Sequence, residues 1–424
     1  MAIRKMMKAF FITGLAMGLG NVSVFAADIK ANVKLGGDIM HVEKDKQSGD
    51  KEWSYLSNEP RNQKDDDGLI IEVDNGNAGA HIAMWYKTAT KETSDGEDDW
   101  AAHFRRTYVW FKPIDMVKIQ VGYVGCDAHF KEKIDEWKVG NPFAVTERDW
   151  AKHPAYINNC DADGWGFGTE IRPTEQLIIN AGITPGIKGS VKTEKKEDTS
   201  AMYNKDGSNE KKTKIAPWGL GARYYWNKFE FQASFRDGGQ DDKRNGTWRV
   251  ARFGIGYNDD WTYSFIQPIF GFDYNATKEK WEMNGVCLDA YSEINVDAFK
   301  FYLHAPVTIR NGDAKTDVNY MEFNFKAEYN TGSHANIDDL KPYIQLSSNQ
   351  DDAAWGNTVT RVWLLDKHFK DSFNMSYKVG MNFMISGAEI DVGVKYDQLS
   401  KYHKVAYGKS WIVSVPFTVK MKNF

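Results

Sequence analysis

The sequence predicts an all-β protein, an antiparallel transmembrane β-barrel, and three features of the chain lead to this fold class. Apolar and polar residues alternate with a period of two along most of the 424 residues, the pattern of strands with two different faces. Many alternating runs extend over about 9 to 13 residues, the length that a tilted strand needs to cross a bilayer. Aromatic residues form 14% of the chain and gather near the ends of the runs, as in membrane barrels with aromatic girdles.

Two segments show the alternation most clearly. In residues 229–236, Phe and Ala side chains share one face, and Glu, Gln, Ser and Arg side chains share the other. In residues 373–383 the same division continues without a break. Trp110, Trp226 and Trp261 lie near the ends of such runs, where indole rings fit the headgroup level of a bilayer.

The first residues have the features of a secretory signal. Arg4, Lys5 and Lys8 form a positive segment, residues 9–25 are apolar with small residues, and Ala26 ends a sequence typical of a cleavage site. Glycines and an asparagine interrupt the apolar segment, so it is too broken for a membrane-spanning helix of about 20 residues. We therefore expect a signal peptide at 1–26 and a single barrel domain at 27–424.

Charge and hydropathy exclude several function classes. The signal holds three of the 54 basic residues and none of the 58 acidic ones, so the mature chain carries 51 against 58, a net charge of −7. This balance argues against a nucleic-acid partner. The mean hydropathy of −0.56 excludes a helical membrane protein but not a barrel, because barrel strands average out to hydrophilic.

The number of strands follows from counting the alternating runs. Their connections alternate between short turns and long polar loops, as short periplasmic turns and long outer loops do in bacterial barrels. The count is 18, with 16 as the alternative because short runs such as 68–74 are weak. Residues 43–67 and 358–365 are assigned to long outer loops, and no plug domain is predicted. The runs span 29–41, 68–74, 78–88, 103–112, 115–124, 164–173, 176–186, 216–226, 229–237, 247–257, 261–274, 282–293, 297–308, 317–330, 340–348, 373–385, 388–397 and 410–423.

The chain resembles the outer-membrane porins of diderm bacteria, with a spirochaete-type member as one candidate. The features that carry the resemblance are the signal, the aromatic-flanked hairpin at 108–122 and the terminal Phe424. It implies export to the outer membrane, contact with outer-membrane lipid, and recognition of Phe424 by the barrel-assembly machinery. Trimers are usual in such porins, so a homotrimer is an expectation beside a monomer. In the last run the apolar side chains are at odd-numbered positions, so Phe424 falls on the other face. Lys420 and Lys422 also stand where the assembly signal of such porins would have apolar residues.

The sequence contains no pattern typical of an enzyme, a metal site or a cofactor site. The nine His and three Cys form no CxxC or HExxH motif, and no GxSxG motif is present. Acidic runs at 65–67 and 95–99 lack the spacing of a calcium loop, so they are interpreted as solvated loop segments. We therefore predict neither catalysis nor a cofactor.

The polar faces of the runs would form the wall of the pore. Reading them from the sequence gives fifteen basic and eight acidic residues, a balance of +7, although the mature chain as a whole is negative. A positive wall lowers the barrier for anions. The residues expected to carry this role are Lys118, Arg172, Arg223, Arg236, Arg252, Lys300, Lys326, Lys378 and Lys395.

The longest connection, 125–163, is a candidate constriction loop. If it folds into the barrel, its acidic side chains would face the basic wall; these are Glu132, Asp135, Glu136 and Asp149. Cys126 and Cys160 lie at its two ends, and a disulfide there would hold the ends together in an oxidising compartment. The alternatives are an exposed loop and two free thiols.

These expectations favour a water-filled diffusion channel for small hydrophilic solutes and ions, with an anion preference. The first alternative is a surface adhesin or antigen that uses the long loops on a barrel scaffold. The second is a sugar-selective channel, because sugars stack on aromatic rings and four tyrosines fall on lumen faces: Tyr225, Tyr302, Tyr320 and Tyr343.

Overall fold

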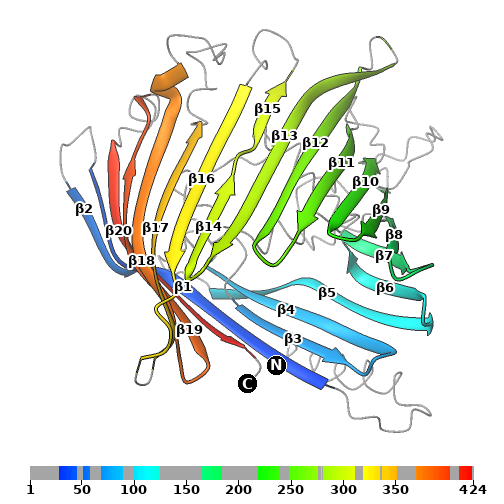
Figure 1. Ribbon diagram of the computed structural model, residues 1–424, viewed down its shortest axis with the longest axis horizontal. Helices are drawn as coiled ribbons and strands as arrows, with labels where there is room; N and C mark the ends of the chain where they lie inside the picture. The colour runs from blue at the N-terminus through cyan, green and yellow to red at the C-terminus, as the bar shows by residue number, and fades with distance from the viewer. Residues whose placement is uncertain are drawn as a thin grey trace, which may run out of the picture.

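The computed structural model is a barrel of antiparallel strands (Figure 1). It describes residues 28–44, 51–57, 68–88, 100–124, 164–183, 218–237, 248–275, 278, 280–310, 319–334, 337–350, 369–401 and 410–422. Its twenty strands are β1 (Asp28–Lys44), β2 (Lys51–Ser57), β3 (Gly68–Asp74), β4 (Ala78–Thr88), β5 (Trp100–Ile114), β6 (Val117–Val124), β7 (Gly164–Ile171), β8 (Leu177–Ile183), β9 (Trp218–Trp226), β10 (Phe229–Asp237), β11 (Trp248–Asn258), β12 (Thr262–Asn275), β13 (Lys280–Val296), β14 (Phe299–His304), β15 (Val307–Arg310), β16 (Asn319–Tyr329), β17 (Asp338–Gln350), β18 (Phe373–Ile385), β19 (Ala388–Gln398) and β20 (Trp411–Lys422). A short 3-10 helix, η3 (Phe369–Ser372), precedes β18. Within these described ranges, the model contains no helix with the length and apolar character needed to cross a bilayer.

The twenty strands occupy 18 positions around the barrel, which confirms the predicted number. Two positions each hold two consecutive strands: β2 and β3 both pair with β1, and β14 and β15 both pair with β13 and β16. The ring closes where β1 pairs with β20, from Asn32 opposite Lys422 to Glu43 opposite Ile412. Closure satisfies the backbone of every position and leaves no sheet edge facing lipid.

One predicted boundary is wrong. The sequence analysis assigns residues 43–67 to a long outer loop, whereas β1 continues to Lys44 and Lys51–Ser57 forms β2, with Val42 opposite Trp53. Polar residues flank this segment on both sides, and Leu56 follows Tyr55 directly and breaks the alternation, so the segment does not stand out from a polar loop. Residues 358–365 lie outside the described residues.

Exposure confirms the predicted faces of the strands. In β18 the exposed residues are Tyr377, Val379, Met381 and Ile385, with Val379 63% exposed, whereas Asn374 and Ser376 on the other face are buried. The apolar face of the barrel is therefore its outer surface and the polar face its inner surface. This is the reverse of a soluble sandwich, which buries its apolar face.

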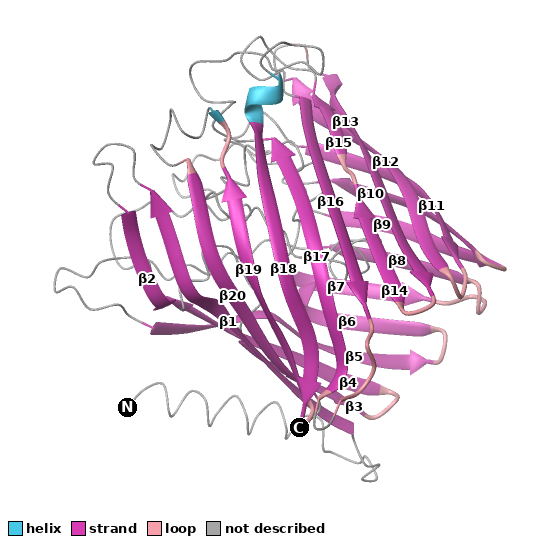
Figure 2. Cartoon of the chain, turned by 60° about the vertical axis from the view of Figure 1, so that its left-hand side comes forward, coloured by secondary structure: helices cyan, strands magenta, loops and turns pink. Residues whose placement is uncertain are grey.

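The short turns lie along one rim of the barrel (Figure 2), and their residues explain why they are tight. The β18–β19 turn consists of Ser386 and Gly387, with φ of 50° and 81°, and Asn227 begins the β9–β10 turn with φ of 54°. Positive φ values at these positions match the right-handed twist of the flanking strands. The predicted short connections are confirmed, and both ends of the chain's strand series lie at the same rim.

Aromatic side chains surround this rim, although not all those predicted. Trp226 and Trp261 are exposed on the outer surface, and the Trp226 ring lies 6.3 Å from that of Phe229. Trp110 differs, because it is buried and packs on the inner face against Gly79, where a Cβ atom would lie 2.6 Å from its ring. The sequence analysis places Trp110 near a strand end. Its neighbours Val109 and Phe111 are exposed on the outer surface, so the alternation of side chains turns Trp110 toward the inside.

Candidate pore wall

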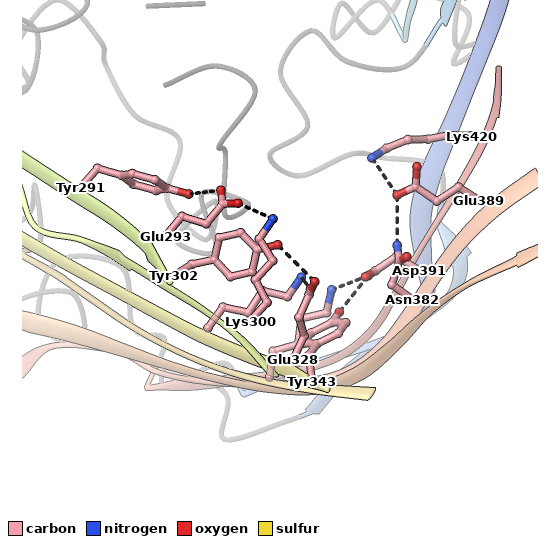
Figure 3. A network of polar contacts seen from close by, with 12 residues as sticks. Tyr291, Glu293, Lys300, Tyr302, Glu328, Tyr343, Asn382, Glu389, Asp391 and Lys420 are labelled. Carbon is pink, nitrogen blue, oxygen red and sulfur yellow. Dashed lines mark hydrogen bonds and ion pairs between the residues drawn. The ribbon is translucent and has the colours of Figure 1, made fainter. Parts of the chain in front are cut away.

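A continuous group of polar side chains lines the inner surface from β9 to β20, near the rim with the short turns. Figure 3 shows most of its members pointing into the barrel from neighbouring strands. They are acids, bases and tyrosines, with one asparagine. We call this group the polar belt; it consists of Arg223, Glu230, Tyr263, Tyr291, Glu293, Lys300, Tyr302, Lys326, Glu328, Tyr343, Lys378, Asn382, Glu389, Asp391 and Lys420.

The first feature of the polar belt is its ion pairs. Five bases and five acids form five pairs, most of them between neighbouring strands. The nitrogen–oxygen distances are 2.7 Å for Lys326–Glu328 and Lys378–Asp391, 3.1 Å for Arg223–Glu230 and 3.5 Å for Lys420–Glu389, and the fifth pair is Lys300–Glu293. The charge of the belt is therefore balanced.

Tyrosine hydroxyl groups donate hydrogen bonds to the same carboxylates. Tyr343 Oη donates to Asp391 at 2.9 Å, and Tyr302 Oη donates to Glu328 at 3.1 Å. Two weaker contacts repeat the arrangement: Tyr291 with Glu293 at 3.3 Å and Tyr263 with Glu230 at 3.5 Å. Each of these carboxylates thus forms an ion pair with a basic side chain and accepts a hydrogen bond from a tyrosine hydroxyl group. The two interactions together fix its position.

The lysines of the belt also lie over the faces of the tyrosine rings. Lys300 and Lys326 lie 5.0 and 5.3 Å from the centre of the Tyr302 ring. Lys326 and Lys378 lie 4.5 and 5.1 Å from the centre of the Tyr343 ring. Ammonium groups are attracted to aromatic faces at such distances, so lysines and tyrosines contact one another across four adjacent positions of the wall, from β14 to β18.

Glycine makes this arrangement sterically feasible. Tyr343 is directly opposite Gly380 in the β17–β18 register, and a Cβ atom at Gly380 would lie 2.6 Å from the Tyr343 ring. The ring therefore lies flat over the glycine and against the wall, with 3% of the residue exposed. Its hydroxyl group reaches Asp391 on β19, one strand further on.

The structure brings four of the predicted wall residues together and places the others apart. Arg223, Lys300, Lys326 and Lys378 belong to the polar belt. Four others lie outside the belt. Lys118 lies 4.6 Å from the centre of the Trp110 ring, and Arg252 is buried on β11. Arg172 pairs with Glu170 at 2.6 Å near a short turn, and Lys395 pairs with Asp397 at 2.9 Å. Arg236 lies on β10, and its side chain is outside the described part of the structure.

Sequence reasoning missed five acids that face the lumen. These acids reduce the excess of bases that the sequence predicts for the lumen faces. Glu293 was missed because its face of β13 also carries Tyr291 and Cys287 and therefore resembles an apolar face. In β1, the irregular register between Asp38 and His41 changes the parity of the residues that follow. The five acids are Asp38, Glu43, Asp289, Glu293 and Asp397.

Several predicted site residues lie outside the described residues. These are Glu132, Asp135, Glu136 and Asp149 of the proposed constriction loop, the two cysteines Cys126 and Cys160, and Phe424. Among the residues that the structure does describe, no group of three or more His, Cys, Asp or Glu side chains could hold a metal ion.

Three of the four tyrosines proposed for sugar stacking have a cation close to the ring. Lysine ammonium groups lie over Tyr302 and Tyr343, and the Arg223 guanidinium lies 6.0 Å from the Tyr225 ring. The side chain of Tyr320 is outside the described residues. The arrangement therefore favours charged or polar groups over a flat sugar ring.

Comparison with known proteins gives a likeness of fold. No family model matches the chain, and no curated protein matches it in sequence. OccAB2 of Acinetobacter baumannii is 9% identical with a TM-score of 0.51 over 95% of this chain and 99% of that one. OpdL of Pseudomonas aeruginosa is 12% identical with a TM-score of 0.50 over 94% and 99%. A BenF-like porin from Pseudomonas fluorescens is 10% identical with a TM-score of 0.48 over 94% and 98%. At these identities, OccAB2 and OpdL support the barrel fold only, over at least 94% of this chain and 99% of each of theirs.

Proposed function

We propose that this chain forms a water-filled channel for small hydrophilic solutes and ions in the outer membrane of a diderm bacterium. One observation carries the proposal: a closed barrel of 18 positions presents apolar side chains outward and charged, hydrogen-bonded side chains inward. A barrel of about 16 to 18 strands is wide enough for an aqueous lumen, whereas about eight strands enclose only side chains. The inward charges would be costly without water or a solute path beside them.

The neighbours in fold support the same reading. Two neighbours, OpdL and OccAB2, share the barrel over at least 94% of each chain, so the architecture that the proposal needs also occurs in solved structures. We also propose that the chain catalyses no reaction. The five ion pairs make the belt itself neutral, which supports a weak anion preference at most.

Further features belong to the proposal. Residues 1–26 would be removed on export, Phe424 would be read by the barrel-assembly machinery, and a homotrimer is the expected assembly. The acids of loop 125–163 would narrow the lumen, and a Cys126–Cys160 disulfide would join the loop ends. An adhesin on a barrel scaffold remains the competing class, and it requires no conduction.

Incorporation into planar bilayers tests the channel. The refolded full-length mature chain should produce discrete conductance steps, with a reversal potential close to zero in a potassium chloride gradient. A correctly folded barrel without conductance steps would refute the channel and favour the adhesin. The matched control is the Val379→Arg variant, which should give fewer conducting channels for the same amount of protein, because it places a charge on the lipid face and destabilises the inserted barrel.

A further inference from the structure

We propose that the polar belt favours zwitterionic solutes, small molecules that carry a cationic and an anionic group together. This inference rests on the proposed channel and names its class of solute. It follows from the pairing of the wall charges, which the sequence alone would not predict. Sequence analysis gives a basic wall and favours anions, whereas the structure gives five bases matched with five acids.

The first step of the argument is that the charged groups can be reached from the lumen. The side chains of Lys420 and Lys300 are 39% and 34% exposed, and those of Glu389 and Asp391 are both 25% exposed. Tyr343 and Tyr291, which support them, are buried. The belt therefore consists of a fixed layer of phenol rings beneath a layer of charges that a solute can touch.

The second step concerns what happens when a solute binds. An anion that pairs with Lys378 draws it from Asp391, and the carboxylate then loses its cation in a partly dehydrated site. Leaving one member of such a pair without its partner is costly. A zwitterion avoids this cost, because its carboxylate pairs with the lysine while its ammonium group pairs with the released acid. One ion pair of the wall is then replaced by two ion pairs with the solute, and neither wall charge is left without a partner.

The third step is the spacing of the charges. Bases and acids alternate on adjacent strands, as with Lys300 opposite Glu328 and Glu389 opposite Lys420. The charged atoms of a belt pair lie close together, 2.7 Å apart for Lys378 and Asp391. The ammonium and carboxylate of an α-amino acid are attached to the same carbon atom, so they are also close together. One small zwitterion can therefore bridge the base and the acid of a single pair once the two side chains move apart. A series of such sites leads from β13 to β20.

Uptake into proteoliposomes at pH 6 and symmetrical salt would test the inference. Four radiolabelled solutes of similar size would be compared: alanine as the zwitterion, propionate as the anion, alaninamide as the cation and lactamide as the neutral molecule. Alanine should enter about two to five times faster than each of the others, the factor expected from one partly exposed ion pair. If propionate entered faster than alanine, or if lactamide entered as fast as alanine, the inference would be overturned and the proposed channel would stand. No uptake of any solute by folded protein would refute the channel itself.

Three variants would locate the preference in the belt. Asp391→Asn should shift uptake toward propionate, Lys378→Gln should shift it toward alaninamide, and the double variant should reduce the preference for alanine without favouring either ion. Asp371→Asn removes an acid that pairs with Lys401 at 3.4 Å outside the belt, at the start of β18, and it should leave the order of solutes unchanged. Unchanged uptake in the first two variants would show that the belt does not select the solute.

Discussion

The clearest structural prediction is the cost of a charge on the outer surface of β18. Val379 is the seventh of the thirteen residues of this strand and 63% exposed, so it faces lipid near the middle of the bilayer. An arginine at the midplane of a barrel costs about 2 to 4 kcal/mol. Since about 1.36 kcal/mol corresponds to a factor of ten, Val379→Arg should lower the ratio of folded to unfolded protein by about 30- to 900-fold.

The matched control places the same side chain on the inner surface of the same strand. Asn382 donates a hydrogen bond to Glu389 at 3.0 Å, so Asn382→Arg would bring a cation beside a carboxylate in the lumen. Its stability should change little. Urea titration of both variants in lipid vesicles, followed by tryptophan fluorescence and by heat-modifiable migration on gels, measures the difference. Equal stabilities of the two variants would refute the assignment of the two faces.

Three further predictions concern the belt, a short turn and the longest loop. Gly380→Ala should destabilise the barrel by about 1 to 3 kcal/mol in the same titration, because the added Cβ displaces the Tyr343 ring; stability equal to wild type would contradict this packing. At the short-turn rim, a hydrogen bond and the charge of Lys228 hold the pKa of Asp259 below its usual range; this stabilisation is present at neutral pH and is lost as pH falls through the lowered pKa. Lys228→Met should therefore be less stable than wild type at pH 7 and equal to it in acid, and a difference independent of pH would exclude the pair as its cause. Deletion of 131–152 should raise single-channel conductance if the loop narrows the lumen, and an unchanged conductance would place the loop outside it.

The faces and the number of strands could be predicted because they depend on a local pattern. A period of two over about ten residues fixes which side chains face lipid, and the exposures of Tyr377, Val379 and Met381 follow it. The same reasoning fails where the pattern is broken or shifted. In β2 the alternation is broken at Leu56 within a polar segment, and in β1 the irregularity between Asp38 and His41 shifts the later polar side chains to the other set of alternating positions.

The pairing of the wall charges could not be predicted, because it depends on the exact register between strands and on the directions of long side chains. Tyr343 and Asp391 are 48 positions apart in the chain, and only the β17–β18 and β18–β19 registers bring them within 2.9 Å. Gly380 illustrates the same limit. From sequence it is a small lumen residue that should accept a larger side chain, whereas the structure shows it covered by an aromatic ring.

The central claim is that the polar faces of the strands line the conducting path, and cysteine accessibility on β18 tests it most directly. Asn382→Cys places a thiol on the inner face, and Met381→Cys places one on the outer face, where Met381 is exposed. A charged, water-soluble thiol reagent added to open channels should change the single-channel conductance of Asn382→Cys. It should leave Met381→Cys the same as the unsubstituted chain, whose described cysteine, Cys287, is buried. A response of Met381→Cys with none from Asn382→Cys would contradict the claim.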